Sequence, residues 1–340
     1  MLESAGTRST RGRVTIGQVA AMAGVSPTTV SHVFSGKRLV GAATRERVEE
    51  AVRALDYRPS NVARNLRTRR SHMVAVIVPD LTNQFYSVLT RGLADTVDAV
   101  GYGTYVCNTD ALLGREHKFV QDVLDRGVDG VVIAPVDAAP GTLSGSIYLG
   151  TPVVCLGDGI DLPEVDRVIA DDENGSRAAT AHLLNAGATR VAMIRGPSGA
   201  GTSRITGYRR AVEEAGGTFV PALTVDGRWT RQGGREAMAR LMHLEPRPDG
   251  VFCANDLMAI GAMDTARSFG LRIPDDVALA GFDDVEAAAL VTPALTTVEN
   301  PAYATGCEAA KLLLSRMRGE YEGERRTVVL DCNLVERESG

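Results

Sequence analysis

The sequence contains few of the residues that bind metal ions or form crosslinks. Its 340 residues include 5 cysteines, 5 histidines and 1 tryptophan. The cysteines are scattered and form no CxxC pair, so we expect buried reduced thiols rather than disulfides or metal ligands. The histidines form no ligand cluster. We therefore expect neither a metal site nor a cofactor.

Short catalytic motifs are missing as well. The patterns GxSxG, HExxH and GxGxxG do not occur. Residues 196–203 have the glycine spacing of a phosphate-binding loop, but Thr202 stands where that loop needs a lysine. Asp283 and Asp284 are paired carboxylates, yet neighbours in sequence usually point in different directions. The sequence therefore predicts no catalytic residues and a protein that is not an enzyme.

No apolar run is long enough to span a membrane. Residues 1–13 lack the apolar core of a signal peptide, so we expect a cytoplasmic chain that begins with a disordered basic arm.

The charge is unevenly distributed. A net charge of −5 would by itself argue against DNA as a partner. However, residues 1–70 hold 13 Lys and Arg against 5 Asp and Glu, whereas the remainder holds 24 against 37. A basic head on an acidic body is typical of a DNA-binding module joined to a regulatory one.

Residues 14–36 (VTIGQVAAMAGVSPTTVSHVFSG) predict two short helices joined by a tight turn. Thr15, with a glutamine three residues on, forms a capping box that starts the first helix. Gly24 can adopt the left-handed conformation that ends it, and Ser26-Pro27 starts the second helix. A third helix is expected over residues 41–55.

The side chains of the two short helices separate into an apolar and a polar set. The outward residues of the second helix are short and hydrogen-bonding, which predicts a helix-turn-helix whose second helix enters a DNA major groove. An ordinary helical hairpin is the alternative. The residues expected to point inward are Val19, Ala20, Met22, Ala23, Val30, Val33 and Phe34, and those expected to face outward are Thr28, Thr29, Ser31 and His32.

Residues 14–36 and 44–66 resemble the DNA-binding headpiece of LacI/GalR-type bacterial transcriptional regulators, and the similarity continues to about Arg337. The headpiece is most similar to the purine-repressor type, because it has TTVSHV, an arginine two residues before Val40, and Pro-Ser ahead of the hinge. Ser35 departs from the asparagine that is usual in the family, which leaves the operator sequence open.

The resemblance implies that residues 58–70 form a hinge helix when two chains lie side by side on a palindromic operator. Leu66 matches the leucine that wedges into the minor groove, and Arg64 and Arg67 would flank phosphates. A flexible basic linker is the alternative. The DNA-binding set that the resemblance implies is Thr15, Ser26, Thr28, Thr29, Ser31, His32, Arg38, Tyr57, Ser60, Ala63, Arg64, Leu66 and Arg67.

From Met73 onward, apolar strands alternate with amphipathic helices in two successive series, which predicts an α/β fold with parallel sheets. The second series is expected to begin with the strand VIADD, and TVVLDCNLVER is expected to be one final strand. Ligands of such sheets gather at the carboxyl ends of the strands. The polar residues that follow strands should therefore face one cleft: Asp80, Asp158, Arg204, Asn255 and Asp283.

The body resembles the family's two-lobed core, which is similar to periplasmic sugar-binding proteins. In VPDLTNQFY, Gln84 replaces a common proline. The resemblance implies that Arg204 grips the effector and that Trp229 is an aromatic residue facing it. The position of Asp158 is open by one residue. The implied effector set is Asp80, Phe85, Tyr86, Asp158, Arg204, Trp229, Asn255, Asp283 and Asn300.

The expected organisation has four parts. A basic arm covers residues 1–13, the helix-turn-helix domain 14–57, the hinge 58–70, and the effector-binding and dimerisation core 71–340. The first lobe of the core should cover about 71–170 and 300–327, and the second about 171–299 and 328–340. No leucine-heptad tail follows, which favours a homodimer over a tetramer.

The sequence thus predicts an effector-controlled transcriptional regulator, most simply a repressor, associated with the bacterial nucleoid. A sugar-binding or transport component is the alternative, but it leaves residues 14–66 unexplained. The effector is expected to be a sugar, with a purine as the alternative, and the sequence does not distinguish an inducer from a corepressor.

Overall fold

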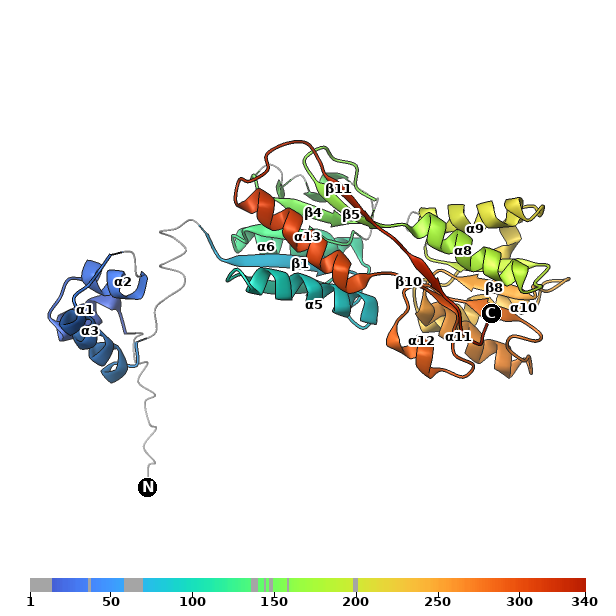
Figure 1. Ribbon diagram of the computed structural model, residues 1–340, viewed down its shortest axis with the longest axis horizontal. Helices are drawn as coiled ribbons and strands as arrows, with labels where there is room; N and C mark the ends of the chain where they lie inside the picture. The colour runs from blue at the N-terminus through green and yellow to red at the C-terminus, as the bar shows by residue number, and fades with distance from the viewer. Residues whose placement is uncertain are drawn as a thin grey trace, which may run out of the picture. The chain divides into compact units, whose positions relative to one another are not determined.

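The computed structural model describes residues 14–35, 38–57, 70–135, 140–143, 145–146, 149–157, 159–197 and 201–340 (Figure 1). The chain divides into two units between Arg69 and Arg70. The first unit holds the predicted headpiece and the second holds the predicted core.

The first unit is built from α1 (Ile16–Ala23), α2 (Pro27–Ser35) and α3 (Ala42–Ala54). The predicted capping box of Thr15 is present, Gly24 has φ 63° after α1, and the Ser26 hydroxyl accepts from the Thr29 N–H at 3.1 Å. These local signals therefore define the helix ends as expected. The small core contains Val19, Ala20, Ala23, Val30, Val33, Val48 and Ala51.

Two apolar residues of the headpiece do not point inward as expected. Met22 is 57% exposed and Phe34 is 44% exposed. Three short helices enclose only a few side chains, and valines and alanines already fill that space. Phe34, near the end of α2, instead lies beside the Tyr57 ring, with 6.0 Å between the ring centroids.

The first lobe of the second unit contains a six-stranded parallel sheet in the order β11-β5-β4-β3-β1-β2. The helices α5 (Gln84–Asp98) and α13 (Ala302–Met317) pack together on one face, and α6 (Leu113–Asp125) packs on the other (Figure 1). The strands are β1 (Met73–Val78), β2 (Gly103–Asn108), β3 (Gly130–Ile133), β4 (Val153–Leu156), β5 (Asp166–Ala170) and β11 (Thr327–Leu330), and η1 (Pro140–Leu143) is a short 3-10 turn.

The pairing of α5 with α13 requires glycine at the contact. A Cβ at Gly92 would lie 2.2 Å from the Tyr303 carbonyl oxygen, and a Cβ at Gly306 would lie 2.0 Å from that of Leu89. The two helix backbones therefore approach each other more closely than a residue with a side chain at either position would allow.

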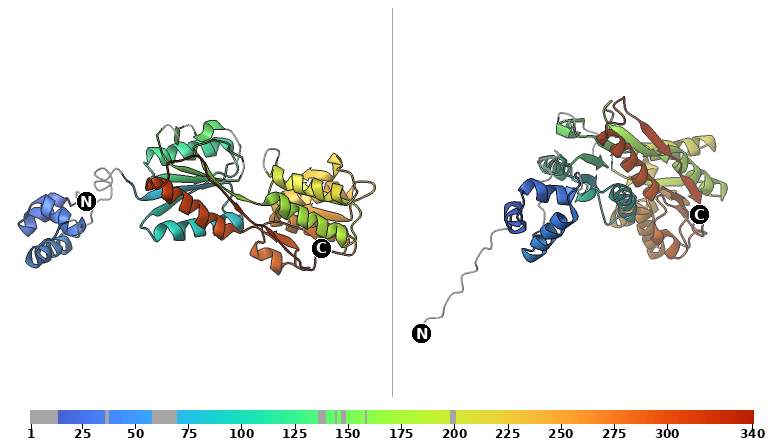
Figure 2. Two further views of the ribbon diagram at one scale, coloured as in Figure 1. Left: turned by 45° about the horizontal axis from the view of Figure 1, so that its top comes forward. Right: turned by 60° about the vertical axis from the view of Figure 1, so that its left-hand side comes forward.

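The second lobe contains a four-stranded parallel sheet in the order β7-β6-β8-β9. The helices α8 and α9 form one packed pair and α10 and α11 the other, on a shared apolar core (Figure 2). The elements are β6 (Val191–Arg195), β7 (Thr224–Asp226), β8 (Gly250–Cys253), β9 (Ala278–Ala280), α8 (Asp172–Asn185), α9 (Thr202–Glu214), α10 (Arg231–Met242), α11 (Asp256–Ser268), α12 (Glu286–Leu290) and η2 (Pro221–Leu223).

Two strand assignments differ from the sequence-based expectation. The VIADD strand belongs to the first sheet, because β5 pairs with β4 and β11. TVVLDCNLVER forms two strands: β11 stays in the first sheet through Leu330, and β12 (Asn333–Val335) pairs antiparallel with β10 (Thr297–Glu299). The last passage therefore follows residue 330 rather than 327, because the Leu330–Ala170 pairing holds β11 in the first sheet.

A buried ionic cluster fastens the far edge of the first lobe. The carboxylate of Asp166, which is 0% exposed, accepts from Arg316 at 2.7 and 2.8 Å and from Arg326 at 2.7 Å. Burial alone would raise the pKa of Asp166, but the hydrogen bonds from the two arginines lower it below its ordinary value. This cluster joins β5, α13 and the segment before β11.

Among the helices that the structure describes, none has the length and apolar content to cross a membrane.

We predict that Asp166→Asn destabilises the core by on the order of 3 kcal/mol at neutral pH, because two arginines lose a buried anion. Since the folded-state pKa of Asp166 is lowered, its contribution is present above the ordinary Asp range of about 4 and is lost as pH falls through the lower folded value. The destabilisation should therefore shrink in acid. Urea unfolding at pH 7 and pH 3 measures it.

Asp161→Asn is the matched control, because Asp161 also pairs with two arginines, Arg167 and Arg325, but its side chain is 81% exposed. It should change the unfolding midpoint little. Equal effects of the two variants would show that the buried cluster has no special role.

Candidate functional site

The exposed face of α2 carries the residues predicted to read DNA. Thr28 is exposed, and Thr29, Ser31 and His32 are half-buried. The Thr29 and Ser26 hydroxyls lie 2.9 Å apart, so Thr29 takes part in the helix start. None of these four α2 side chains belongs to the headpiece core, which is the arrangement that a recognition helix needs.

The remaining headpiece candidates differ in how the structure uses them. Thr15 and Ser26 are exposed caps of α1 and α2, Arg38 is exposed, and Tyr57 is half-buried against Phe34. The basic arm at 1–13 lies outside the described residues. So do the predicted hinge contacts, which are Ser60, Ala63, Arg64, Leu66 and Arg67.

In the second unit, Arg204 is the centre of a charged cluster. It lies on the first turn of α9 and is 8% exposed. Its Nη2 atom lies 3.1 Å from the Asp172 carboxylate and 3.5 Å from that of Asp283, and its Nη1 atom donates to the Ala254 carbonyl. Its guanidinium also lies over the Phe282 ring, 3.7 Å from the centroid. The cluster therefore combines a fixed cation, two anions and an aromatic face.

Asp283 is held in this cluster by an unusual backbone. Its φ is 103°, and the φ of Asp284 is 50°, both in the region that side chains rarely adopt. The Asn300 amide donates to the Asp283 carboxylate at 3.2 Å. Burial raises the pKa of Asp283 to about 6, although Arg204 and Asn300 both favour its ionised form.

Asp256 braces the loop that carries Asp283. It is 0% exposed, and its carboxylate accepts from the Val285 N–H at 2.8 Å and from the Thr297 hydroxyl at 2.5 Å. Its own N–H donates to the Phe282 carbonyl at 2.8 Å. Burial raises the pKa of Asp256 well above its ordinary value. The loop is thereby tied on both sides of Asp283.

Aromatic residues from both lobes reach the same charged cluster. Burial and the charge of Asp283 raise the pKa of Tyr86, and Asp80 also acts on it. The Trp229 ring lies 5.8 Å from the Arg204 guanidinium carbon. Because Tyr86 comes from α5 and Trp229 from the second lobe, the cleft has aromatic groups on both sides.

Asp80 and Asn255 use their polar atoms in hydrogen bonds within their own lobes. The Asp80 carboxylate accepts from the Thr82 N–H at 2.8 Å and from its hydroxyl at 2.7 Å. Asn255 caps α11 by accepting from the Met258 N–H at 2.9 Å, and it donates to the Trp229 carbonyl at 3.1 Å. Asn255 therefore fixes the backbone of Trp229, whose φ of 60° needs such support.

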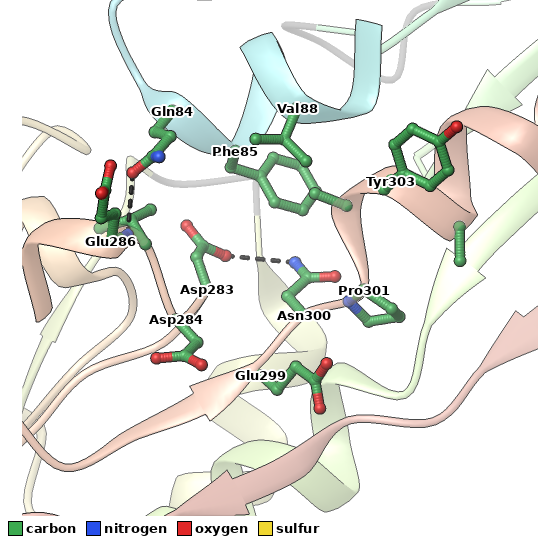
Figure 3. Close-up of a pocket in the computed structure, with 13 residues that line it drawn as sticks. Gln84, Phe85, Val88, Asp283, Asp284, Glu286, Glu299, Asn300, Pro301 and Tyr303 are labelled. Carbon is green, nitrogen blue, oxygen red and sulfur yellow. Dashed lines mark hydrogen bonds between the residues drawn. The ribbon is translucent and has the colours of Figure 1, made fainter. Parts of the chain in front are cut away.

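A pocket of about 390 Å³ opens where the lobes meet (Figure 3). Of the predicted residues it brings together Phe85, Asp283 and Asn300, and Asp158 lies outside the described residues. The other predicted residues are not in its lining, although Arg204 contacts it through the ion pair with Asp283: Asp80, Tyr86, Arg204, Trp229 and Asn255. The pocket is lined by Gln84, Phe85, Val88, Asp283, Asp284, Val285, Glu286, Glu299, Asn300, Pro301, Ala302, Tyr303 and Ala304.

Sequence reasoning missed Asp172 and Gln84. Asp172 is the first residue of α8 and is separated from β5 only by Asp171, so the rule that selected polar residues after other strands would also have selected it. In the sequence Gln84 stands out only as a departure from proline, and nothing local reveals its partner in the other lobe. Within the described ranges, no three His, Cys, Asp or Glu side chains are grouped so as to hold a metal ion.

Family models match both ends of the chain. The model described as bacterial regulatory proteins, lacI family, matches residues 15–60, and the model described as periplasmic binding protein-like domain matches residues 180–340.

Relatives cover nearly the whole chain. The HTH-type transcriptional repressor PurR of Aliivibrio salmonicida (strain LFI1238) is 32% identical over 329 residues, covering 96% of this chain and 98% of the relative. PurR of Vibrio cholerae serotype O1 (strain M66-2) is 34% identical, covering 96% and 97%.

Solved structures give the same result. The transcriptional regulator CelR in complex with cellobiose is 34% identical, with a TM-score of 0.73, covering 96% of this chain and 100% of that one. The lac repressor dimer bound to operator and the anti-inducer ONPF is 26% identical, with a TM-score of 0.84, covering 96% and 99%. From the headpiece, the two-lobed core and these relatives together, the chain belongs to the LacI family of bacterial regulatory proteins, and it is a ligand-controlled, DNA-binding transcriptional regulator rather than an enzyme.

Proposed function

We propose that the cleft between the lobes binds a sugar, and that the bound sugar changes the affinity of the headpiece for its operator. The observation that carries this proposal is Arg204, buried between Asp172 and Asp283 and beside aromatic rings. A sugar hydroxyl both donates and accepts, so it pairs with carboxylates and with a guanidinium. The apolar face of a sugar ring packs on an aromatic ring such as that of Trp229. CelR, a similar regulator, was solved with cellobiose.

A purine acting as a corepressor is the second candidate. Flat aromatic side chains and an amide also suit a nucleobase, and relatives at 32–34% identity are named PurR. A binding test separates the two candidates, because only sugars or only purines should raise the melting temperature of the protein.

On DNA, the chain acts as a homodimer in the bacterial cytoplasm, at the nucleoid. Two α2 helices enter successive major grooves of a palindromic operator, with Thr28, Thr29, His32 and Arg38 as candidates to contact base edges. Leu66 wedges into the minor groove between the half-sites, and Arg64 and Arg67 lie at phosphates. The lac repressor was solved as a dimer on its operator, which supports this arrangement.

The lobes transmit the signal. Tyr86 belongs to the first lobe, and Arg204 and Asp283 belong to the second, so a ligand that contacts both sets favours one angle between the lobes. The first lobe continues directly from the hinge residues, so the angle changes the spacing of two headpieces in a dimer. Couplings of this type amount to about 1–3 kcal/mol.

Replacing Arg204 with Lys should abolish the effector response and leave operator binding intact, because a lysine cannot make the planar paired contacts of a guanidinium. Thermal-shift assays with cellobiose, ribose, adenine and guanine first identify the class that raises the melting temperature. Gel shifts with that compound then compare the variant with the wild type. Arg235→Lys, a change in an exposed ion pair of the same lobe, is the control. Loss of operator binding in Arg204→Lys, with the fold intact, would contradict the assignment.

His32→Ala should lower affinity for an operator selected from random DNA by about 5- to 150-fold, the effect of one good base contact. Binding to random DNA should change far less, since that binding depends on phosphates. Glu49→Ala, an exposed change on α3, is the control. Equal losses on operator and random DNA would show that His32 does not read sequence; fluorescence anisotropy at fixed salt measures both.

A further inference from the structure

Gln84 forms a hydrogen bond that joins the two lobes. Its Oε1 atom accepts from the backbone N–H of Glu286 at 2.8 Å, between residues 202 positions apart in the chain (Figure 3). Gln84 is the first residue of α5, which packs in the first-lobe core through Phe85 and Leu89. Glu286 is the first residue of α12, which packs in the second-lobe core through Ala288. The bond therefore depends on how the lobes are arranged.

The donor of this bond needs a partner from outside its own helix. The first N–H groups of a helix have no carbonyl partner within it. Val285 precedes α12 and provides no side-chain cap. The Val285 N–H donates to Asp256, which belongs to the second lobe. The next N–H, that of Glu286, donates to Gln84, which belongs to the first lobe. The start of α12 is thus capped from both lobes at once.

The same short segment carries the charged cluster of the cleft. Asp283, which pairs with Arg204, and Asp284 immediately precede Val285, and both have left-handed backbones. A change in the position of α12 would therefore shift Asp283. Asp283, Asp284 and Glu286, which line the pocket beside this contact, each carry a carboxyl group. A neutral acceptor such as a glutamine amide meets the N–H without adding a further negative charge.

We propose that Gln84 is a positioning residue: by capping α12 from across the cleft, it holds the lobes in the arrangement seen here and sets how often the ligand-free protein adopts it. This inference rests on the proposed coupling between lobe angle and operator affinity. It adds the residue that determines the resting state, through the amide side chain that supplies this bond.

A double-mutant cycle tests the pair in the full chain without any ligand. Gln84→Met keeps the length of the side chain and removes the acceptor. Glu286→Pro removes the donor, and proline is compatible with this site because Val285 is extended, with φ −68° and ψ 151°, and because proline is favoured at the first helical position. Glu286→Ala, which removes the carboxylate but keeps the N–H, and Gln232→Met, which removes a glutamine bonded within α10, are the controls.

The readout is the distance between the lobes, measured by pulsed electron spin resonance. Non-natural residues at the exposed positions Lys118 of α6 and Arg240 of α10 carry the labels, and labelled chains are diluted with unlabelled ones. This distance reports the lobe angle, which a loss of stability alone does not change.

Gln84→Met and Glu286→Pro should each reduce the ratio of this arrangement to more open ones by about twofold to tenfold, as expected for one hydrogen bond. The double variant should show no further reduction, and both controls should match the wild type. Unchanged distances in Gln84→Met, or additive effects in the double variant, would overturn the inference. Neither result would bear on operator or effector binding, because no ligand or DNA is present in this experiment.

Discussion

Arg204 imposes the main physical constraint on the cleft. A guanidinium with 8% exposure needs compensating charge and hydrogen bonds, and it receives them from Asp172, Asp283 and the Ala254 carbonyl. Holding Asp283 beside it requires a left-handed backbone, which in turn is braced by Asp256. The result is a rigid set of donors and acceptors at the carboxyl ends of parallel strands, where such folds bind ligands.

The loop that carries Asp283 in the second lobe is also linked to the first lobe. Asn300, which contacts Asp283, lies on the segment that returns to the first lobe just before α13. Gln84 reaches the same loop from α5. Because α5 and α13 pack through Gly92 and Gly306 with no room for side chains, we expect these two helices to move together. A rearrangement at Asp283 would therefore displace the face of the first lobe that α5 and α13 form.

Much of this could be predicted from the sequence, wherever the cause is local. Thr15, Gly24 and Ser26 define helix ends through neighbours three or four residues away, and the structure confirms them. Strand alternation and the rule for strand ends gave the α/β class and selected Arg204 and Asp283, which the structure brings together.

The sequence-based predictions are wrong where contacts between distant segments of the chain determine the structure. Periodicity assigned Met22 and Phe34 to an inward face, but it does not measure how few side chains a three-helix core can hold. The last strand divides at Leu330 because residues up to Leu330 pair with β5, which comes from a far earlier part of the chain, and no local pattern reveals that pairing. The partners of Asp172 and Gln84 likewise come from segments that no local pattern connects.

Occupancy of the cleft and binding of DNA are coupled in one protein in the mechanism proposed above. The most direct measurement is a pair of titrations: operator affinity with and without the sugar or nucleobase that stabilises the protein, and the affinity for that compound with and without operator. Both affinities should change by the same factor, about 5- to 150-fold, because coupling between two sites is reciprocal. A compound that binds at Arg204 and leaves operator affinity unchanged would contradict it.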